Sequence, residues 1–485
     1  MRDLALLTDL YQLTMLFGYH RNGMSGRRAV FTMFYREAPG LQYAVMAGNA
    51  QLSEYISELH FREEDISYLD SLHLFDRDFL DSLRDFRFEG DILAVPEGSI
   101  LFPGEPMVLV DAPLAQAQLI ETALLNLIGH QTLIATKANR IVRAAQGDRV
   151  MEFGLRRAQG PDAGVLGARA AVIGGCSSTS NVKAGQVFGV PVSGTHAHSW
   201  VMSFDSELEA FRAYAKCFPD SCLLLVDTYD TLGSGVPNAI KVFEELREQG
   251  KKPLGIRLDS GDLAYLSIKA RKMLDEAGFQ KAIICASNDL DEYLIRDLKI
   301  QGARIDLWGV GTKMITGMDR SALGGVYKMC ALENQGVMEP KIKLSDNPDK
   351  VTLPGRQELY RLYTADGMAA ADLIALSGEE FDFSKPLTIF DPKDTWKKMT
   401  LSDYRVKKML EPLVESGKPS SAPRSLKEIQ AYRKQEEGSI WDQYLRLVNP
   451  SIFKVDLSDK LWALKHTMLH GRWETDKPEQ QLPPR

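Results

Sequence analysis

The chain contains 485 residues, of which 44% are hydrophobic and 25% are charged, and it carries a formal net charge of −7. This composition is typical of an ordinary globular protein with a large core and two or three domains. The negative charge excludes a basic nucleic-acid-binding face for the chain as a whole, although it leaves room for local cationic pockets. We therefore expect a protein that acts on small molecules and does not bind nucleic acid.

The start of the chain and its cysteines indicate the compartment. Asp3 and Asp9 interrupt the N-terminus where a signal peptide would be apolar, and no apolar run approaches the roughly 18 residues that a membrane helix needs. The cysteines number five, which is odd, and three lie in or beside predicted buried strands, as reduced core thiols do. These features predict a cytoplasmic protein without a membrane segment.

The first 135 residues mix helical and strand-like patterns. The expected elements are a helix over 4–19, strands over 29–35 and 92–95, a hairpin turn at 104–106 and an apolar-rich helix over 114–128. This region is predicted to form an α+β domain.

Between about residues 149 and 312, short apolar runs recur, and each ends in small or charged residues. The expected strands cover 150–153, 171–173, 190–192, 222–226, 253–256, 282–286 and 305–308. Helical patterns separate several of them, which is the signature of parallel βα units. An α/β barrel keeps its active site at the C-terminal ends of such strands, so the polar residues after each run are the candidate functional residues.

Helix boundaries in this stretch are legible from capping signals. Ser206 with Glu209 forms a capping-box pattern, and Pro219 ends the helix that follows. Asp262 can cap a helix closed by Gly278, so its carboxylate has a structural interpretation as well as a functional one.

The remainder of the chain changes character beyond about Gly324. Short strands are expected around 327–332 and 358–363, and a Ser-, Pro- and Gly-rich loop at 416–425 precedes a short helix. The expected organisation is an N-terminal α+β domain (1–135), an α/β barrel domain (136–325), a β-containing segment that packs back on the N-terminal domain (326–400) and a C-terminal helical region (401–485).

Two histidines stand in a Gly-Thr-His-Ala-His-Ser motif at a strand end. His198 and His196 are each compatible with a nucleophile, an acid or base, a metal ligand or a structural core histidine. A barrel zinc site would need further ligands at later strand ends, yet the only later histidines are His466 and His470, without the metalloprotease pattern. We therefore reject a zinc hydrolase.

Other strand ends carry groups suited to phosphate, metal and ring binding. Asp227 and Asp259 suit Mg²⁺ or sugar hydroxyls, whereas helix capping or loop solvation explains Asp230 and Asp289 equally well. Arg156 beside Phe153 suits a flat aromatic carboxylate, although residue type alone favours a surface arginine beside a core phenylalanine. The groups that can converge on one phosphate are Arg257, Ser287, Asn288, Gly309, Gly311 and Thr312.

Eight short pieces of the chain, taken together, resemble the nicotinate phosphoribosyltransferases, a family of type II phosphoribosyltransferases. The pieces are Thr8 to Gln12, Phe34 to Arg36, Glu152 to Gly160, Thr179 to Val182, Gly194 to Ser199, Asp227 to Asp230, Arg257 to Asp262 and Gly309 to Lys313. The resemblance implies an incomplete TIM-like α/β barrel with a C-terminal extension, in a homodimer whose N-terminal domain closes over the neighbouring barrel. It also implies an ATP-coupled ligase of NAD salvage that converts nicotinate and phosphoribosyl pyrophosphate to nicotinate mononucleotide and pyrophosphate.

The resemblance also assigns roles by position. It implies that ATP phosphorylates His198, that Asp227 and Asp259 face the ribose and Mg²⁺, and that Arg156 holds the substrate carboxylate. The ring would stack between Phe153 and Tyr11 of the other subunit. Further substrate contacts are implied for Ser180, Thr195 and Arg257. The 5-phosphate contacts would be Arg257, Ser287, Asn288, Gly309, Gly311 and Thr312. Arg36 of the other subunit would bind the phosphates at the Mg²⁺-pyrophosphate site, and Lys328 and Lys343 are weaker candidates for the same role. His196 occupies a variable position and receives no role.

The nearest alternative is a nicotinamide phosphoribosyltransferase, which shares the fold and places an aspartate near the ring substituent. This chain has Ser180 there, and a serine can donate to a carboxylate that an aspartate would repel. A catalytically silent nucleotide-binding regulator is a second alternative, against which intact His198, Asp227, Arg257 and Asp259 argue.

Overall fold

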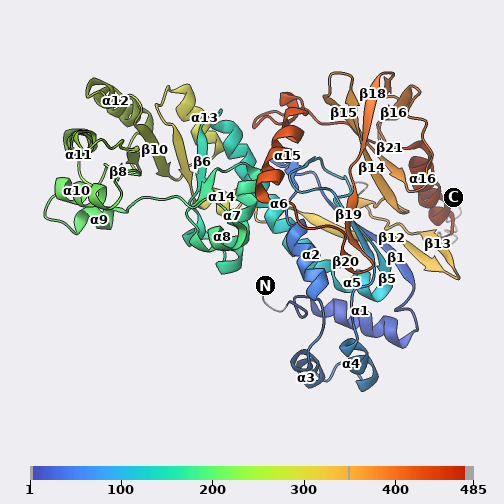
Figure 1. Ribbon diagram of the computed structural model, residues 1–485. Coiled ribbons are helices and arrows are strands. Elements are labelled where there is room, and N and C mark those ends of the chain that lie inside the picture. Colours follow the sequence, from blue (N-terminus) through green and yellow to red (C-terminus); the bar gives the residue numbers. More distant parts are fainter. Residues whose placement is uncertain (1–3, 348–349, 476–485) are drawn as a thin grey trace, which may run out of the picture. The chain divides into compact units, whose positions relative to one another are not determined.

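The computed structural model describes residues 4–347 and 350–475, which form two compact units (Figure 1). Unit 1 contains the described residues up to 132, residues 322–425 and the described residues from 431 on. Unit 2 contains residues 133–321 and 426–430. Within the described ranges, no helix is both long enough and apolar enough to cross a membrane.

Unit 1 is built on a seven-stranded antiparallel sheet. In spatial order its strands are β13 (Val337–Pro340), β12 (Gly325–Asn334), β1 (Arg28–Tyr35), β5 (Val108–Pro113), β3 (Asp91–Ala94), β19 (Glu411–Glu415) and β20 (Lys418–Pro419). Strand β1 is rich in aromatic and β-branched residues and is buried along nearly its whole length, as a central strand covered on both faces is. Because β12 pairs with β1, the chain after residue 325 returns to the N-terminal region.

Helices and a small hairpin complete the N-terminal part of unit 1. They are α1 (Leu10–Arg21), α2 (Asn49–Glu58), α3 (Glu63–Ser71), α4 (Arg77–Arg84), α5 (Leu114–Leu119), the start of α6 (Glu121–Ala144), and the paired strands β2 (Ala44–Val45) and β4 (Ile100–Leu101). The helix predicted over 4–19 therefore begins only at Leu10, after a turn, and the one predicted over 114–128 is divided between α5 and α6.

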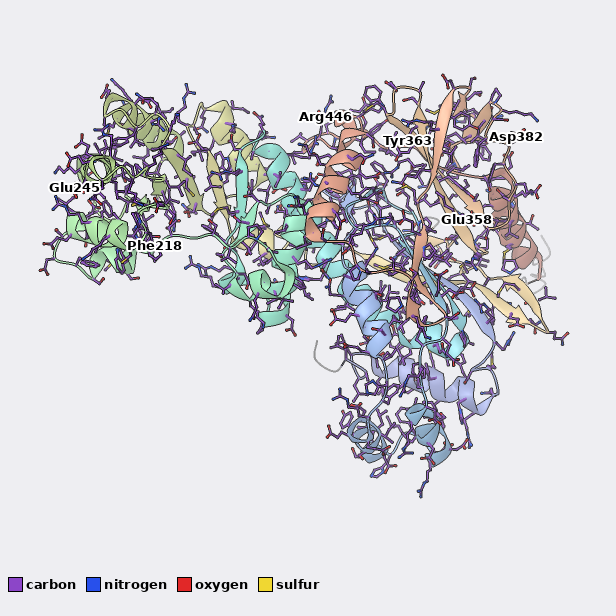
Figure 2. All side chains as sticks on the ribbon, viewed as in Figure 1. Phe218, Glu245, Glu358, Tyr363, Asp382 and Arg446 are labelled. Atoms are coloured by element: carbon purple, nitrogen blue, oxygen red, sulfur yellow. The ribbon has the colours of Figure 1, made fainter. Side chains whose placement is uncertain are left out.

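A second sheet of unit 1 has four strands. They are β18 (Tyr404–Lys408), β14 (Gln357–Thr364), β15 (Ala369–Leu376) and β21 (Val455–Leu457), and the hairpin β16 (Leu387–Phe390) and β17 (Lys398–Leu401) packs nearby. Glu358 and Tyr363 of β14 are labelled in Figure 2. Glu358 Oε1 accepts a cross-strand hydrogen bond from Lys408 Nζ at 2.8 Å.

The prediction that 401–485 is a helical region was wrong for much of its length. Its described part, residues 401–475, contains four strands, β18 to β21, as well as α15 (Leu426–Gly438), the 3-10 turn η4 (Asp442–Tyr444) and α16 (Asp459–Thr475). These strands are short and mostly half-exposed, so they lack the apolar run that makes a strand recognisable. The Pro-containing tail beyond residue 475 lies outside the described residues.

Unit 2 contains a six-stranded parallel sheet with helices between its strands (Figure 1). Its strands are β6 (Arg149–Glu152), β7 (Ser178–Thr179), β8 (Leu223–Leu225), β9 (Gly255–Leu258), β10 (Ile283–Asn288) and β11 (Leu307–Val310). Its helical segments are η1 (Leu155–Arg157), α7 (Pro161–Gly174), α8 (Val182–Phe188), α9 (His198–Met202), α10 (Glu207–Cys217), the π-turn η2 (Thr231–Gly235), α11 (Val236–Glu248), α12 (Leu263–Glu276), α13 (Glu292–Ile300) and α14 (Thr312–Ile315).

The strand order of unit 2 is β7-β6-β11-β10-β9-β8. Strands β8 to β11 follow one another in chain order, and β11 then pairs with β6, the first strand of the series. This is the neighbour order of a parallel ring that is interrupted between β7 and β8. Among the strands of the described residues, no pairing between β7 and β8 that would close the ring is observed.

Two of the seven predicted strands differ in the structure. Residues 171–173 lie in α7 rather than in a strand, because a short apolar run is common to buried strands and buried helices. Residues 190–192 contribute only a parallel bridge between Thr179 and Val192. The other five predictions overlap β6, β8, β9, β10 and β11.

Candidate active site

The carboxyl ends of the unit 2 strands bring several of the predicted site residues together. At the end of β9, Arg257 donates from Nε to Ser287 Oγ at 3.0 Å, on the neighbouring strand β10. Its Nη1 donates to Thr195 Oγ1 at 2.9 Å and approaches the His196 carbonyl oxygen at 3.3 Å. The guanidinium is thus fixed from two directions, and its side chain is 14% exposed.

Asp259 and Asp227 are linked to each other and to this arginine. Asp227 Oδ2 accepts from the Asp259 backbone N–H at 2.7 Å and from Ser260 Oγ at 2.8 Å. Asp259 Oδ1 accepts from the Ser287 hydroxyl and lies 3.5 Å from Arg257 Nη2. Parallel strands end at the same edge of their sheet, which explains why residues 30 positions apart meet here.

His198 begins α9 beside the Asp259 carboxylate. Its Nδ1 is hydrogen-bonded to Thr228 Oγ1 at 3.1 Å, and its Nε2 lies 3.7 Å from Asp259 Oδ2. The side chain is 38% exposed. An imidazole held at one nitrogen, with its other nitrogen near solvent, is suited to phosphoryl transfer or proton transfer.

The aromatic candidate Phe153 lies against Gly309 of β11 and Gly311, which follows this strand. A Cβ on Gly309 would lie 2.7 Å from the Phe153 ring, and one on Gly311 would lie 3.2 Å from the Phe153 carbonyl oxygen. Glycine at 309 therefore leaves the space that the ring occupies. Thr312 follows as the first residue of α14. Asn288, at the end of β10, has a φ of 123°, which a non-glycine residue adopts at a cost of about 1–3 kcal/mol and which is common at functional sites.

Glu152 joins the ends of β6 and β7, and the sequence did not single it out. Its carboxylate is fully buried and accepts from Thr179 Oγ1 at 2.5 Å and from the Gly154 backbone N–H. Its backbone carbonyl accepts from the Ser180 N–H at 2.9 Å. Burial raises the pKa of the Glu152 carboxyl, against the opposing effect of these two donors. The only local signal in the sequence is an acid at the end of an apolar run, and its partners on β7 give that signal its meaning.

The predicted ring-binding residues differ in their surroundings. Arg156 lies exposed in η1, and Ser180 is half-buried after β7. The surface-arginine alternative for Arg156 is therefore still open.

The candidates that were expected to act across a dimer lie in unit 1. Tyr11 is 49% exposed on α1, and Arg36 follows β1 with its Nε buried and without a hydrogen-bond partner among the described residues. Lys328 Nζ donates to the Tyr327 carbonyl oxygen at 2.7 Å, and the Lys343 backbone N–H donates to Thr352 Oγ1 at 3.0 Å. Their contribution to a shared site stays a prediction.

The Asp227 carboxylate has the chemistry to hold Mg²⁺. Its Oδ1 is buried and has no hydrogen-bond partner in the described part of the chain, whereas its Oδ2 has two donors. No cluster of three or more protein ligands occurs among the described residues. Mg²⁺ usually takes only one or two carboxylates and fills its shell with water and substrate phosphates, so the residues present fit this ion.

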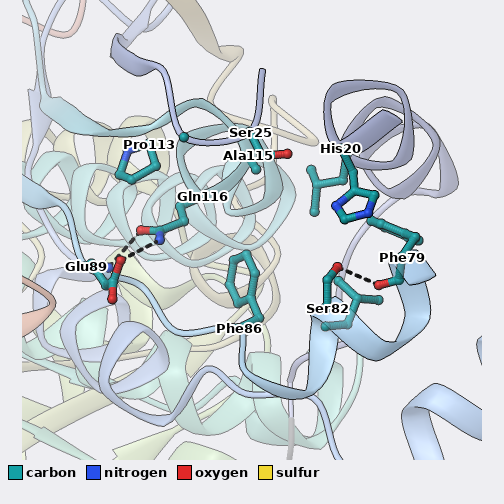
Figure 3. A pocket seen from close by; sticks show the side chains of 12 residues that line it. His20, Ser25, Phe79, Ser82, Phe86, Glu89, Pro113, Ala115 and Gln116 are labelled. Atoms are coloured by element: carbon teal, nitrogen blue, oxygen red, sulfur yellow. Dashed lines mark hydrogen bonds between the residues drawn. The ribbon is translucent and has the colours of Figure 1, made fainter. Parts of the chain in front are cut away.

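A pocket in unit 1 lacks the polar set that a catalytic site needs. It has a volume of about 280 Å³ and a lining that mixes apolar side chains, among them Phe79 and Phe86, with polar ones (Figure 3). Several of the polar side chains already bond within the protein, as the Glu89–Gln116 pair shows. With few free polar groups converging on it, this pocket is a weaker candidate than the strand ends.

Comparison with known proteins identifies close relatives. Family models match residues 6–129 (nicotinate phosphoribosyltransferase N-terminal domain), 149–369 (nicotinate phosphoribosyltransferase family) and 356–465 (nicotinate phosphoribosyltransferase C-terminal domain). The nicotinate phosphoribosyltransferase of Bacillus subtilis is 47% identical over 471 residues, 96% of each chain. That of Homo sapiens is 34% identical over 96% of this chain and 97% of its own. The crystal structure of human nicotinic acid phosphoribosyltransferase matches with a TM-score of 0.83 at 31% identity, covering 95% of this chain and 99% of that one.

Proposed function

Since the chain belongs to the nicotinate phosphoribosyltransferase family, we propose that it joins nicotinate to phosphoribosyl pyrophosphate and couples this step to ATP hydrolysis. The pyridine nitrogen forms a bond to the anomeric carbon of the ribose, and the bond from that carbon to the pyrophosphate oxygen breaks. Nicotinate mononucleotide and pyrophosphate leave. The product feeds NAD salvage.

The observation that carries this proposal is the hydrogen-bonded group at the ends of β9 and β10. Arg257, Ser287 and the backbone after β11 offer the donors that a phosphate ester requires. The carboxylates of Asp227 and Asp259 lie beside them, where they can hold ribose hydroxyls and stabilise the positive charge that develops on the sugar ring. These residues orient the anomeric carbon for attack.

We assign the Mg²⁺ of the reaction to Asp227, with Asp259 as a second ligand. The unpartnered Asp227 Oδ1 supports this assignment. Bound there, Mg²⁺ would neutralise charge on the pyrophosphate leaving group.

The nicotinate ring is proposed to lie on Phe153, whose own ring packs against Gly309 of β11. Arg156 and the Ser180 hydroxyl would bind its carboxylate, because both are donors. Tyr11 of a second subunit would cover the other face of the ring, and its exposure on α1 in a single chain is consistent with that role. Arg36, with an unpartnered Nε, would bind phosphate oxygens of the substrate across the dimer.

ATP coupling is proposed to proceed through His198. A neutral imidazole nitrogen takes the γ-phosphoryl group, so that an N–P bond forms while the P–O bond to ADP breaks. Water later hydrolyses the N–P bond and releases phosphate. The half-exposed position of His198, between Thr228 and Asp259, supports this role.

The finer features of architecture are also proposals. The strand order of unit 2 favours an incomplete TIM-like barrel, since only the β7–β8 neighbour pair is missing from a ring. We further propose a cytoplasmic homodimer with shared active sites.

The function is tested by measuring pyridine-nucleotide formation from nicotinate and from nicotinamide, with phosphoribosyl pyrophosphate and Mg²⁺, each with and without ATP. ADP release is followed in parallel. Product from nicotinate with accompanying ADP is the expected result. Product from nicotinamide at equal or greater efficiency would assign the sister activity, and no product from either substrate would favour a catalytically silent regulator.

A further inference from the structure

The interrupted side of the unit 2 sheet contains a buried histidine to which the family resemblance assigns no role. Strand β8 is at the end of the strand order, so the N–H groups on its outer side have no neighbouring strand. Val226 N–H points inward and donates to the Arg257 carbonyl oxygen of β9. Leu225 N–H points the other way and donates to His196 Nε2 at 3.2 Å. The imidazole therefore occupies the position of a missing strand's carbonyl.

The segment that leads to His196 starts at β7, the strand on the opposite edge of the interrupted sheet. The bridge between Thr179 and Val192 attaches this segment to β7, and His196 attaches it to β8. Residues 193–196 thus span the interruption between the two strands. Buried backbone donors at a sheet edge need such a substitute acceptor.

The main chain of the same residue contacts the phosphate-binding candidates. The His196 carbonyl oxygen accepts from Thr195 Oγ1 at 3.0 Å and from Arg257 Nη1 at 3.3 Å. Arg257 Nη1 also donates to Thr195 Oγ1 at 2.9 Å. His198 follows two residues later at the start of α9. A shift of residue 196 would therefore move the hydrogen-bond acceptors of Arg257 and the N-terminal turn of α9 together.

The ring of His196 is held by apolar packing on its other side. It is 8% exposed, its centroid lies 4.6 Å from that of Tyr214 in an edge-to-face contact, and Phe211 lies beyond at 6.3 Å. Burial lowers the pKa of His196 to about 4; a backbone hydrogen bond at Ala197 opposes this shift, and the charge of Arg257 adds to it. The ring is thus neutral near pH 7, with Nε2 free to accept and the proton on Nδ1.

We propose that His196 is a positioning residue, which replaces the missing strand at the edge of β8 and thereby fixes the 193–197 segment against Arg257. Its side chain sets the position of its own carbonyl and of Thr195, and these two acceptors orient the guanidinium toward the substrate phosphate. The inference rests on the proposed function, because it assumes that Arg257 binds phosphoribosyl pyrophosphate.

Two substitutions separate the acceptor from the bulk of the ring. His196→Gln keeps an acceptor at the distance of Nε2, whereas His196→Leu keeps apolar volume and removes the acceptor. We expect His196→Leu to raise the KM for phosphoribosyl pyrophosphate about tenfold, in the range of an unsatisfied buried donor, and to leave the KM for nicotinate within about twofold. We expect His196→Gln to restore the wild-type KM to within about threefold.

Hydrogen exchange provides a readout that does not depend on activity. The Leu225 amide should exchange faster in His196→Leu than in the wild-type protein and in His196→Gln, because its acceptor is lost. Unchanged protection of this amide in His196→Leu would overturn the proposal. So would an unchanged KM for phosphoribosyl pyrophosphate.

Two control variants separate the loss of the hydrogen bond from a loss of packing and test the phosphate-binding role of Arg257. Phe211→Leu loosens the packing on the same ring without touching its hydrogen bond, and an equal rise in KM there would show that packing alone matters and would overturn the proposal. Arg257→Gln tests the premise. If Arg257→Gln leaves the KM for phosphoribosyl pyrophosphate unchanged, the binding role in the proposed function fails; if it raises this KM while His196→Leu does not, only the role of His196 fails.

Discussion

Unit 1 and unit 2 each contain a cluster of charged side chains, but the hydrogen-bonding groups of the two clusters are paired to different degrees. In unit 1, Arg361 is fully buried and donates to Asp372 from Nε at 2.9 Å and from Nη2 at 2.6 Å. Its Nη1 reaches Glu436 at 3.3 Å, and Lys407 reaches the same carboxylate at 2.8 Å. The guanidinium also lies 5.7 Å from the centroid of Phe102.

The strand-end cluster of unit 2 has the same kinds of groups but is left incomplete. Asp227 retains an unpartnered carboxylate oxygen within the described residues, and the His198 side chain is 38% exposed. A paired, closed network stabilises one conformation, whereas an open one keeps capacity for a ligand. The comparison teaches that an unpartnered carboxylate oxygen beside a partly exposed histidine, rather than the presence of charge, distinguishes the candidate active site from the Arg361 network.

The comparison predicts its largest effect at His198. His198→Ala should reduce ATP hydrolysis by roughly 10³-fold or more, because the nucleophile is lost. Weaker, ATP-independent transfer should persist, because the residues proposed to bind the ribose phosphate remain. ADP release and nicotinate mononucleotide formation measure the two effects. His466→Ala, on α16 of unit 1, is the control and should retain both activities; unchanged ATP hydrolysis in His198→Ala would disprove the phosphohistidine role.

Breaking the closed network of unit 1 should affect stability instead. Arg361→Leu leaves Asp372 and Glu436 buried without their guanidinium, so the free energy of unfolding should fall by about 3–5 kcal/mol. Urea denaturation monitored by fluorescence measures this change. Arg424→Leu removes an exposed ion pair with Glu411 at 3.0 Å and should cost at most about 1 kcal/mol. Similar losses in the two variants would show that the buried network is not special.

The stability of unit 2 should depend on pH through His196. Its folded pKa of about 4 lies below the ordinary value of 6.5, so its contribution is complete above pH 6.5 and is lost as the pH falls toward 4. Between pH 7 and pH 5, the free energy of unfolding of the wild-type protein should fall by about 2 kcal/mol more than that of His196→Gln. Urea titrations of both proteins at the two pH values give this difference. Equal losses would contradict the assigned pKa.

A smaller effect is expected on the choice between acid and amide. Ser180→Asp places a carboxylate near the proposed position of the nicotinate carboxylate, so kcat/KM for nicotinate should fall about tenfold relative to that for nicotinamide. Ser180→Asn, similar in size but uncharged, is the matched control. If both variants change the preference equally, charge at residue 180 does not set it.

Much of unit 2 was predictable because local and tertiary signals agree there. Buried parallel strands appear as apolar runs, and their functional residues follow directly, as Arg257 and Asp259 show. The capping signals of Ser206 and Asp262 were confirmed, since both side chains accept from the third residue of their helices. Asp262 therefore serves as a helix cap.

The remainder depends on contacts between distant residues. Residues 171–173 look like a strand but are buried in a helix, and the C-terminal strands are too short and exposed to be recognised. The role of His196 requires knowing that β8 is an edge strand, which no local pattern reveals. Glu152 was overlooked as a site residue because a buried acid inside an apolar run acquires meaning only from its partners on β7.

The central claim is that the strand-end cluster of unit 2 binds phosphoribosyl pyrophosphate, and calorimetric titration of this ligand with Mg²⁺ tests it most directly. Arg257→Gln removes the guanidinium and keeps a neutral side chain of similar reach. The Kd should rise at least tenfold, because a charge-assisted phosphate contact is lost. This corresponds to a loss of about 1.4 kcal/mol or more of binding free energy. Far-ultraviolet circular dichroism should show an unchanged fold. An unchanged Kd in a folded variant would contradict the account and place phosphate binding elsewhere.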